Sequence, residues 1–165
     1  MPDKSEIVIN TGPLIALTAA LDDFGLLGKL YSSIYVPYEV EEEIRVYGAD
    51  GFAVKQVEQA DCLKKAQAPV GNIFPLIKNS LDIGEAAVIQ SAINEGIKTV
   101  CIDETVGRRI ARLSGLKLTG SLGILLKAKR EGYPVLLNEC IMRMRERGIW
   151  LSDRLVSNVL EQAGE

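Results

Sequence analysis

Four oxygen-bearing side chains stand where predicted strands end or predicted helices begin. Asn10 closes the apolar run EIVIN, and Asp103 closes the run KTVCID. Glu85 falls in the first turn of the helix before the second run, and Glu43 falls in the acidic stretch of an earlier helix. In an open α/β sheet, ligands bind beyond the carboxyl ends of the strands. Side chains gathered there would offer several oxygen ligands to a divalent cation.

Each carboxylate of this set also has a plainer explanation. Asp82 and Glu85 are three residues apart, which is the spacing of a capping box at a helix start. Glu43 belongs to the acidic run Glu41–Glu43, and such runs on helices are usually solvated faces. Asp103 directly follows an apolar strand, where it is placed to cap the next helix. The sequence leaves both interpretations open.

The absence of histidine narrows the possible chemistry. It excludes Ser-His-Asp and Cys-His pairs, histidine general bases and the usual zinc hydrolases. The cysteines Cys62, Cys101 and Cys140 are far apart and form no CxxC pair, so we expect them to be reduced, with Cys101 in the core. Chemistry therefore falls to carboxylates, and oxygen ligands alone favour Mg²⁺ or Mn²⁺.

Short apolar runs separated by helical patterns define the scaffold that must position these residues. Near-continuous apolar runs are typical of strands buried in a parallel sheet, and strands separated by helices require right-handed crossovers. We therefore predict one α/β domain over residues 1–165, with three αβα layers around a central parallel sheet of four to five strands. The strands are expected at 6–10, 33–37, 98–103 and 117–120, with a weaker one near 62–67.

The helices are predicted from apolar spacing and from their end signals. Pro13 suits a first helical position, with Thr11 or Gly12 as the cap, and Gly48 is a stop signal for the third helix. The stretch 68–80 is predicted to be a loop with some apolar anchoring. Further helices are expected at 24–31, 38–48, 52–60, 82–96, 104–115, 121–132, 135–147 and 153–163.

The net charge of −3 is unevenly distributed. Residues 1–100 carry 8 Lys and Arg against 14 Asp and Glu, whereas residues 101–165 carry 11 against 8. A polyanionic substrate would meet the basic half while a metal ion offsets repulsion from the acidic half. Two solvated faces of different charge explain the same split equally well.

The composition and the first residues bear on the compartment. The chain is 47% hydrophobic and 25% charged, which is typical of a folded globular protein. No apolar run approaches the ~18 residues that a membrane span needs, and the start lacks the order of a signal peptide. We expect a cytoplasmic protein without a membrane segment. Apolar positions such as Leu26, Leu27, Leu30 and Tyr31 exceed what a small core needs, which favours an interface between copies.

Five segments, in their order along the chain, resemble PIN-domain proteins. The closest likeness is to the subgroup, once catalogued as a domain of unknown function, that has LDxGE and DE-x-x-GR signatures. The resemblance covers nearly the whole chain, and the ordered set is far more specific than any single motif. The segments are IVINTGPLIAL, VPYEVEEEI, LDIGEAAVI, CIDETVGRRIA and LTGSLGILLKAK.

The resemblance implies an activity and partners. PIN-domain proteins are Mg²⁺- or Mn²⁺-dependent ribonucleases with three or four acidic site residues. Many are toxins of toxin-antitoxin pairs, and they are frequently homodimers. The resemblance therefore implies RNA as the substrate, an antitoxin protein as a partner and a homodimer as the assembly.

The resemblance also assigns residues by position. The four acidic positions of the family fall on Asn10, Glu43, Glu85 and Asp103, as metal ligands and catalytic residues. Hydroxyls that the family places near the metal match Thr11 and Thr119 or Ser121. Arg108 matches the GR signature, where a phosphate contact and a salt bridge to Glu104 are equally compatible. Further basic candidates for the RNA backbone are Arg109, Arg112, Lys127 and Lys129.

Asn10 departs from the family pattern, which has Asp at that position. An amide oxygen can ligate a hard cation but brings no charge, so Glu43, Glu85 and Asp103 would have to hold one Mg²⁺ with water. A second ion at ~3.5–4 Å would be harder to hold. Two interpretations remain: a ribonuclease weakened by Asn10, and a catalytically silent PIN-like module that binds RNA or a protein. A receiver-type phosphoacceptor domain fits poorly, because the acidic pair expected after the first strand is missing.

Overall fold

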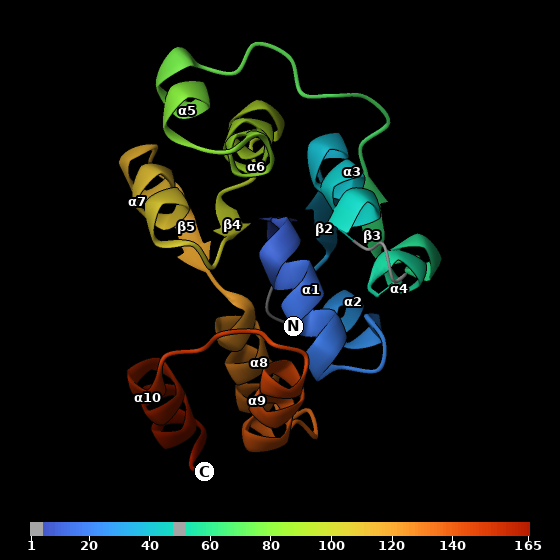
Figure 1. Ribbon diagram of the computed structural model, residues 1–165, viewed down its shortest axis with the longest axis vertical. Helices are drawn as coiled ribbons and strands as arrows, with labels where there is room; N and C mark the ends of the chain where they lie inside the picture. Colours follow the sequence, from blue (N-terminus) through green and yellow to red (C-terminus); the bar gives the residue numbers. More distant parts are fainter. Residues whose placement is uncertain (1–4, 48–51) are drawn as a thin grey trace.

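The computed structural model describes residues 5–47 and 52–165, and five strands of this part form one parallel sheet (Figure 1). The order across the sheet is β3-β2-β1-β4-β5. This confirms the predicted α/β fold with a central parallel sheet. The strands are β1 (Glu6–Ile9), β2 (Ser33–Val36), β3 (Leu63–Lys65), β4 (Thr99–Cys101) and β5 (Lys117–Thr119).

The strand order reverses between β1 and β4. The chain moves outward from β1 to β2 and β3, then returns to place β4 on the other side of β1, with β5 beyond it. Ile9 is in register with Cys101, and the Asn10 N–H donates to the Cys101 carbonyl at 3.0 Å. Asn10 and the residues after Cys101 therefore lie together at the carboxyl edge of the switch point, where α/β sheets bind ligands.

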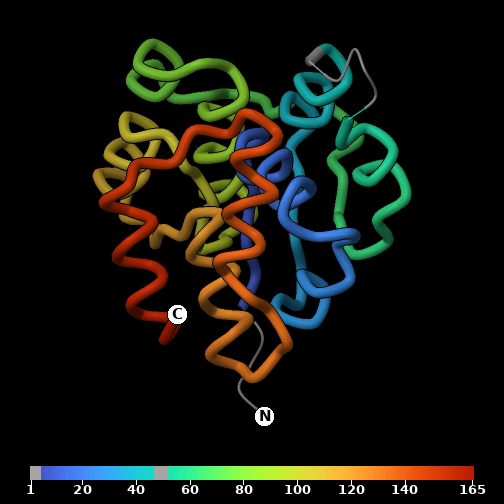
Figure 2. Tube along the Cα trace, turned by 60° about the horizontal axis from the view of Figure 1, so that its bottom comes forward, coloured from blue at the N-terminus to red at the C-terminus, as the bar shows by residue number. Residues whose placement is uncertain are grey.

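Helices cover both faces of the sheet (Figure 1). Helix α6 (Ile83–Glu95) contacts β1 and β4, and α7 (Thr105–Leu113) contacts β5. On the opposite side lie α1 (Thr11–Ala20), α2 (Gly25–Leu30) and α8 (Ser121–Arg130). Figure 2 shows the C-terminal pair, α9 (Leu137–Glu146), which packs on α1, and α10 (Asp153–Ala163), which packs on α8 and α9. The remaining described helices are α3 (Tyr38–Tyr47), α4 (Val54–Gln59) and α5 (Pro75–Ser80).

The core lies between the sheet and these helices. Leu27, Leu30 and Tyr31 are buried in it and Leu26 packs against it, so they are not surplus apolar surface as the sequence suggested. Cys101 is fully buried and the three cysteines are free, as predicted. Large side chains with almost no exposure include Ile7, Ile9, Leu14, Leu17, Ile34, Ile89, Ile124 and Leu125.

Two local predictions were wrong. Helix α1 begins at Thr11 with Asn10 as its N-cap, so Pro13 is the third helical residue. Proline is tolerated there because the first N–H groups of a helix have no intrahelical partner. The predicted loop over 68–80 contains α5, whose first residue is Pro75, and proline favours a first helical position. The proposed stop at Gly48 lies outside the described residues.

The start and end of α6 follow its sequence signals. The Asp82 carboxylate accepts the Glu85 N–H at 2.8 Å, and Gly96 ends the helix with φ 68°. A left-handed residue of this kind is usually glycine. In the described residues, no helix is long and apolar enough to cross a membrane.

Candidate functional site

Asn10 brings an unpartnered amide oxygen to the carboxyl end of β1. The residue is 5% exposed, and its Oδ1 atom is buried with no hydrogen-bond partner in the described residues. Although Asn10 is the N-cap of α1, its side chain makes no capping hydrogen bond. An unsatisfied buried acceptor costs about 1–3 kcal/mol. The oxygen is therefore available to a ligand that enters the site.

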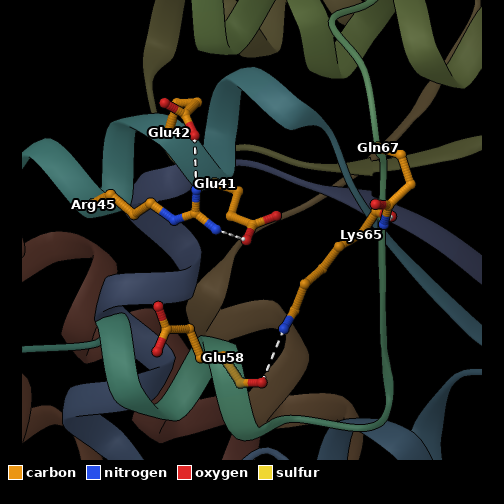
Figure 3. A network of polar contacts seen from close by, with 6 residues as sticks. All are labelled: Glu41, Glu42, Arg45, Glu58, Lys65 and Gln67. Atoms are coloured by element: carbon orange, nitrogen blue, oxygen red, sulfur yellow. Dashed lines mark hydrogen bonds and ion pairs between the residues drawn. The ribbon is translucent and has the colours of Figure 1, made fainter.

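The acidic run on α3 is divided between two environments. The guanidinium of Arg45 binds Glu41 at 2.8 Å and Glu42 at 2.9 Å (Figure 3). Glu43 instead accepts a hydrogen bond of 2.8 Å from the Thr11 hydroxyl of α1. The solvated-face interpretation therefore holds for Glu42, which is 44% exposed, but not for Glu43. Thr11 fixes Glu43 beside Asn10.

Gly84 allows three side-chain oxygen atoms to approach its backbone closely. A Cβ atom at this position would lie 2.5 Å from Glu43 Oε2 and 3.6 Å from both Asn10 Oδ1 and Asp82 Oδ1. These oxygens come from α3, from the end of β1 and from the start of α6. Any side chain at residue 84 would occupy the space on which they converge.

Glu85 is a buried carboxyl surrounded by other acids. It is 6% exposed, and its carboxylate accepts a hydrogen bond from the Asp82 backbone N–H. Its pKa is raised to about 7, first by burial and then by the charges of Asp82, Glu104 and Glu43, while the hydrogen bond from the Asp82 N–H opposes the rise. Its Oε1 atom lies 3.2 Å from the Cβ position of Gly107 on α7. Asp82 and Glu85 therefore form the reciprocal hydrogen bonds of a capping box, so that interpretation holds for both side chains.

The pKa of Glu43 is raised as well. Burial is the main cause, the charge of Asp82 adds to it, and the hydrogen bond from Thr11 opposes it. A nearby cation would favour the charged form of both carboxyls. The sequence pattern indicates Asp82 as a cap and Glu104 as a possible partner for Arg108, but gives no sign of the charge that Asp82 brings to Glu43 and that both residues bring to Glu85.

Asp103 is held by the next strand and helix. Its Oδ1 accepts the Ser121 N–H at 2.8 Å, and its Oδ2 accepts the Ser121 hydroxyl at 2.9 Å. Glu104 is the N-cap of α7, so Asp103 does not cap the following helix. A Cβ atom at Gly120 would lie 2.7 Å from Asp103 Oδ1. Ser121 therefore positions the Asp103 carboxylate through both hydrogen bonds.

Arg108 joins the ends of two strands. Its Nη1 donates to the Ile102 carbonyl at 2.8 Å and to the Thr119 carbonyl at 3.2 Å. The predicted salt bridge to Glu104 is not formed among the described residues, because the side chain bonds these backbone carbonyls instead. Its Nε and Nη2 have no protein partner within the described ranges. The Thr119 hydroxyl makes a long contact of 3.4 Å with the Gly120 carbonyl.

Two of the predicted RNA-contacting lysines are engaged elsewhere. Lys127 pairs with Glu131 at 3.2 Å, and Lys129 pairs with Glu165 at 2.6 Å. Both follow Ser121 along α8 by six to eight residues, or about 9–12 Å of helix. They belong to the opposite end of α8 from Asp103. Arg109 and Arg112 are exposed on α7.

The donors are oxygen atoms, which suit a hard cation in chemistry, but they do not form a complete coordination site. In the part of the chain that the structure describes, no group of three or more Asp, Glu or Cys side chains is arranged to hold a metal ion. The structure instead pairs Glu43 with the unpartnered amide oxygen of Asn10, with Asp82 and Glu85 adjacent. Mg²⁺ often takes one or two protein carboxylates and completes its shell with water. One carboxylate and one amide oxygen with water are donors of the kind that such an ion takes.

The fold and this oxygen-rich edge define an α/β domain with an acidic centre at its topological switch point. The family model DUF3368, described as a PIN domain, matches residues 6–165. The chain therefore belongs to the PIN-domain family, whose members are typically metal-dependent nucleases. No curated protein matches the chain in sequence.

The raised pKa of Glu85 predicts a pH-dependent stability in metal-free protein. The folded-state pKa of about 7 exceeds the ordinary value of 4.5. The contribution of protonated Glu85 to the free energy of unfolding is therefore fully present below pH 4.5 and is lost as the pH rises through 7. Glu85→Gln removes the repelled charge. We expect it to raise the free energy of unfolding by about 1–3 kcal/mol more above pH 7 than near pH 5. Urea unfolding in EDTA at the two pH values measures this difference.

The matched control for this experiment is Glu161→Gln, which removes an exposed carboxylate of α10. Its effect should be small and equal at both pH values. If Glu85→Gln also changed stability equally at both, the carboxyl would not carry the raised pKa.

Proposed function

We propose that this protein is a Mg²⁺- or Mn²⁺-dependent ribonuclease that hydrolyses RNA phosphodiester bonds. The observation that carries the proposal is the close approach of Asn10 Oδ1 and Glu43 Oε2 to Gly84, with the Asn10 oxygen unpartnered. Membership of the PIN-domain family supports the same activity.

The residues divide into two groups with different roles. Glu43 and Asn10 would hold the ion, while Thr11 keeps the Glu43 carboxylate oriented. When bound there, a divalent ion would activate a water and offset charge on the phosphoryl group. Glu85 is a buried carboxyl adjacent to this pair, and a bound cation would favour its charged form, in which it could orient a water or accept a proton.

The second group lies at the ends of β4 and β5. Asp103 is fixed by two hydrogen bonds from Ser121, so it can orient ligands or water without moving. Arg108 is anchored through Nη1, which leaves its other nitrogens for a phosphate oxygen. Thr119 lies beside this anchor and completes the proposed substrate-binding group.

The biological setting is a further part of the proposal. The family resemblance supports the toxin half of a cytoplasmic toxin-antitoxin pair, with an antitoxin protein as partner and a homodimer as the assembly. The alternative function, a silent module that binds RNA or protein, is favoured by one observation. Asn10 supplies no charge at a position where the family has Asp.

Cleavage of single-stranded and structured RNAs in Mn²⁺ tests the activity. We expect slow cleavage by the wild type and none by Asp103→Ala or Glu43→Gln, because each variant removes a carboxylate from the centre. Asn10→Asp should cleave at least about tenfold faster, since it adds the missing charge at the cation. EDTA should stop cleavage by every active form.

Two outcomes would contradict the proposal. Cleavage that survives in Asp103→Ala would come from a contaminant. If neither the wild type nor Asn10→Asp cleaved any RNA, the silent binding module would be the correct function.

A pair of glycine variants tests the ion site without an activity assay. Gly84→Ala places a methyl group 2.5 Å from Glu43 Oε2, whereas the matched Gly12→Ala meets no atom within 4 Å. We expect Gly84→Ala to weaken Mn²⁺ binding by about tenfold or more, because the methyl group fills the space between the ligands. Gly12→Ala should bind like the wild type. Calorimetric titration measures both, and equal affinities in the two variants would place the ion elsewhere.

A further inference from the structure

A second polar cavity lies apart from the acidic centre. It has a volume of about 200 Å³ and is bounded by α3, α6 and residues 66–71. These residues begin the long connection from β3 to α5 that Figure 1 shows. None of the residues that line the cavity belongs to the candidate ribonuclease site.

Glu39 brings an unsatisfied carboxylate to the wall of this cavity. Its Oε1 accepts the Val70 N–H at 2.7 Å and so ties the connection to α3. Its Oε2 is buried and has no hydrogen-bond partner in the described residues. Glu95 lines the same cavity, and no Lys or Arg is among the lining residues. The wall therefore holds two carboxylates without a basic partner of its own.

Ser91 is an independent sign that the cavity is built to receive a donor. It is 3% exposed and lines the cavity, yet its hydroxyl makes no hydrogen bond within the described ranges. Other helical hydroxyls bond back to the carbonyl four residues earlier, as Thr18 does at 2.7 Å and Ser114 at 2.8 Å. The Ser91 hydroxyl remains available to an occupant.

The aromatic side of the wall also favours a cation. Tyr35 and Tyr38 line the cavity, and aromatic faces attract ammonium and guanidinium groups. Burial raises the pKa of Tyr35, and the charges of Glu95 and Glu39 raise it further. The cavity is therefore a region of negative potential.

We propose that this cavity binds a guanidinium or ammonium group, supplied by a basic side chain of a partner polypeptide or by a small free amine. The volume is below the ~300 Å³ at which typical small-molecule pockets begin, so it suits one cationic head group. The carboxylates repel phosphate, which excludes the RNA backbone as the occupant. Glu39 Oε2 and the Ser91 hydroxyl accept the donor's N–H groups. The last torsion of a Glu side chain is broad, so a small rotation brings Oε2 to the ligand.

Amide NMR spectra of the whole chain test the proposal with three probes. The probes are N-acetyl-arginine amide, its neutral isostere N-acetyl-citrulline amide, and spermidine. We expect the arginine derivative to shift the amides of Val70, Ser91 and Asn94 saturably, and citrulline to leave them unchanged. Binding of either cation supports the proposal, and the tighter one identifies the source of the group.

Three variants connect the binding to these side chains. Glu39→Gln keeps an oxygen for Val70 but removes the charge, and should weaken binding by about tenfold. Ser91→Ala should weaken it by about two- to fivefold. Glu42→Gln removes an exposed charge from the same helix and should leave affinity unchanged. If Glu39→Gln fails to fold, Glu95→Gln replaces it, since that residue is exposed.

Three results would overturn the proposal. The first is equal binding of the arginine and citrulline derivatives, which would show that charge is not recognised. The second is wild-type affinity in both Glu39→Gln and Glu95→Gln. The third is saturation of the same shifts by MgCl₂ at lower concentration than by either organic cation, which would make the cavity a metal site.

Discussion

The structure of the site depends on the crowding of carboxylates at one edge of the sheet without a basic partner in contact. Glu85 is buried beside Asp82, Glu104 and Glu43, and its pKa rises to about 7. Ion pairs form elsewhere on the surface, for example between Arg45 and the Glu41 and Glu42 side chains (Figure 3). The guanidinium of Arg108, at the ends of β4 and β5, bonds backbone carbonyls instead. In the absence of a cation, this crowding of carboxylates costs folding energy. That cost supports the assignment of a cation to this site.

Small residues make this crowding possible. Gly84 allows Glu43 and Asn10 to approach the start of α6, and Gly107 allows Glu85 to lie against α7. Gly120 allows the Asp103 carboxylate to reach the start of α8. The strand order supplies the rest, because β1 and β4 are neighbours in space although they are about ninety residues apart in the chain. The strand order thus brings the residues of the candidate site together, and the glycines allow their side chains to pack closely.

Much of the fold was readable from sequence because its signals are local. The apolar runs predicted each described strand, and Asp82 and Gly96 predicted the ends of α6. The error at 68–80 arose because α5 is a short helix whose first N–H groups depend on distant partners. The Phe74 N–H, for instance, is bound by Gln90 of α6. The local sequence pattern does not predict such contacts between distant residues.

The site was predictable only in part for the same reason. Order along the chain pointed to Asn10, Glu43, Glu85 and Asp103, but not to the partners that decide their behaviour. The separation of Glu43 from Glu42 depends on Thr11, which is 32 residues away. The anchoring of Arg108 depends on the Thr119 carbonyl of the next strand. The cavity at Glu39 gave no sequence signal, because its walls come from three separate segments.

The most direct test of the central claim is to locate a bound ion by NMR. Substoichiometric Mn²⁺ broadens the signals of nuclei close to it, and the Asn10 side-chain amide reports from inside the proposed site. We predict that this amide and the backbone amides of Gly84 and Glu85 broaden first, while those of α10 remain sharp. Uniform broadening, or broadening centred away from Asn10, would contradict the assignment of a cation to this edge of the sheet.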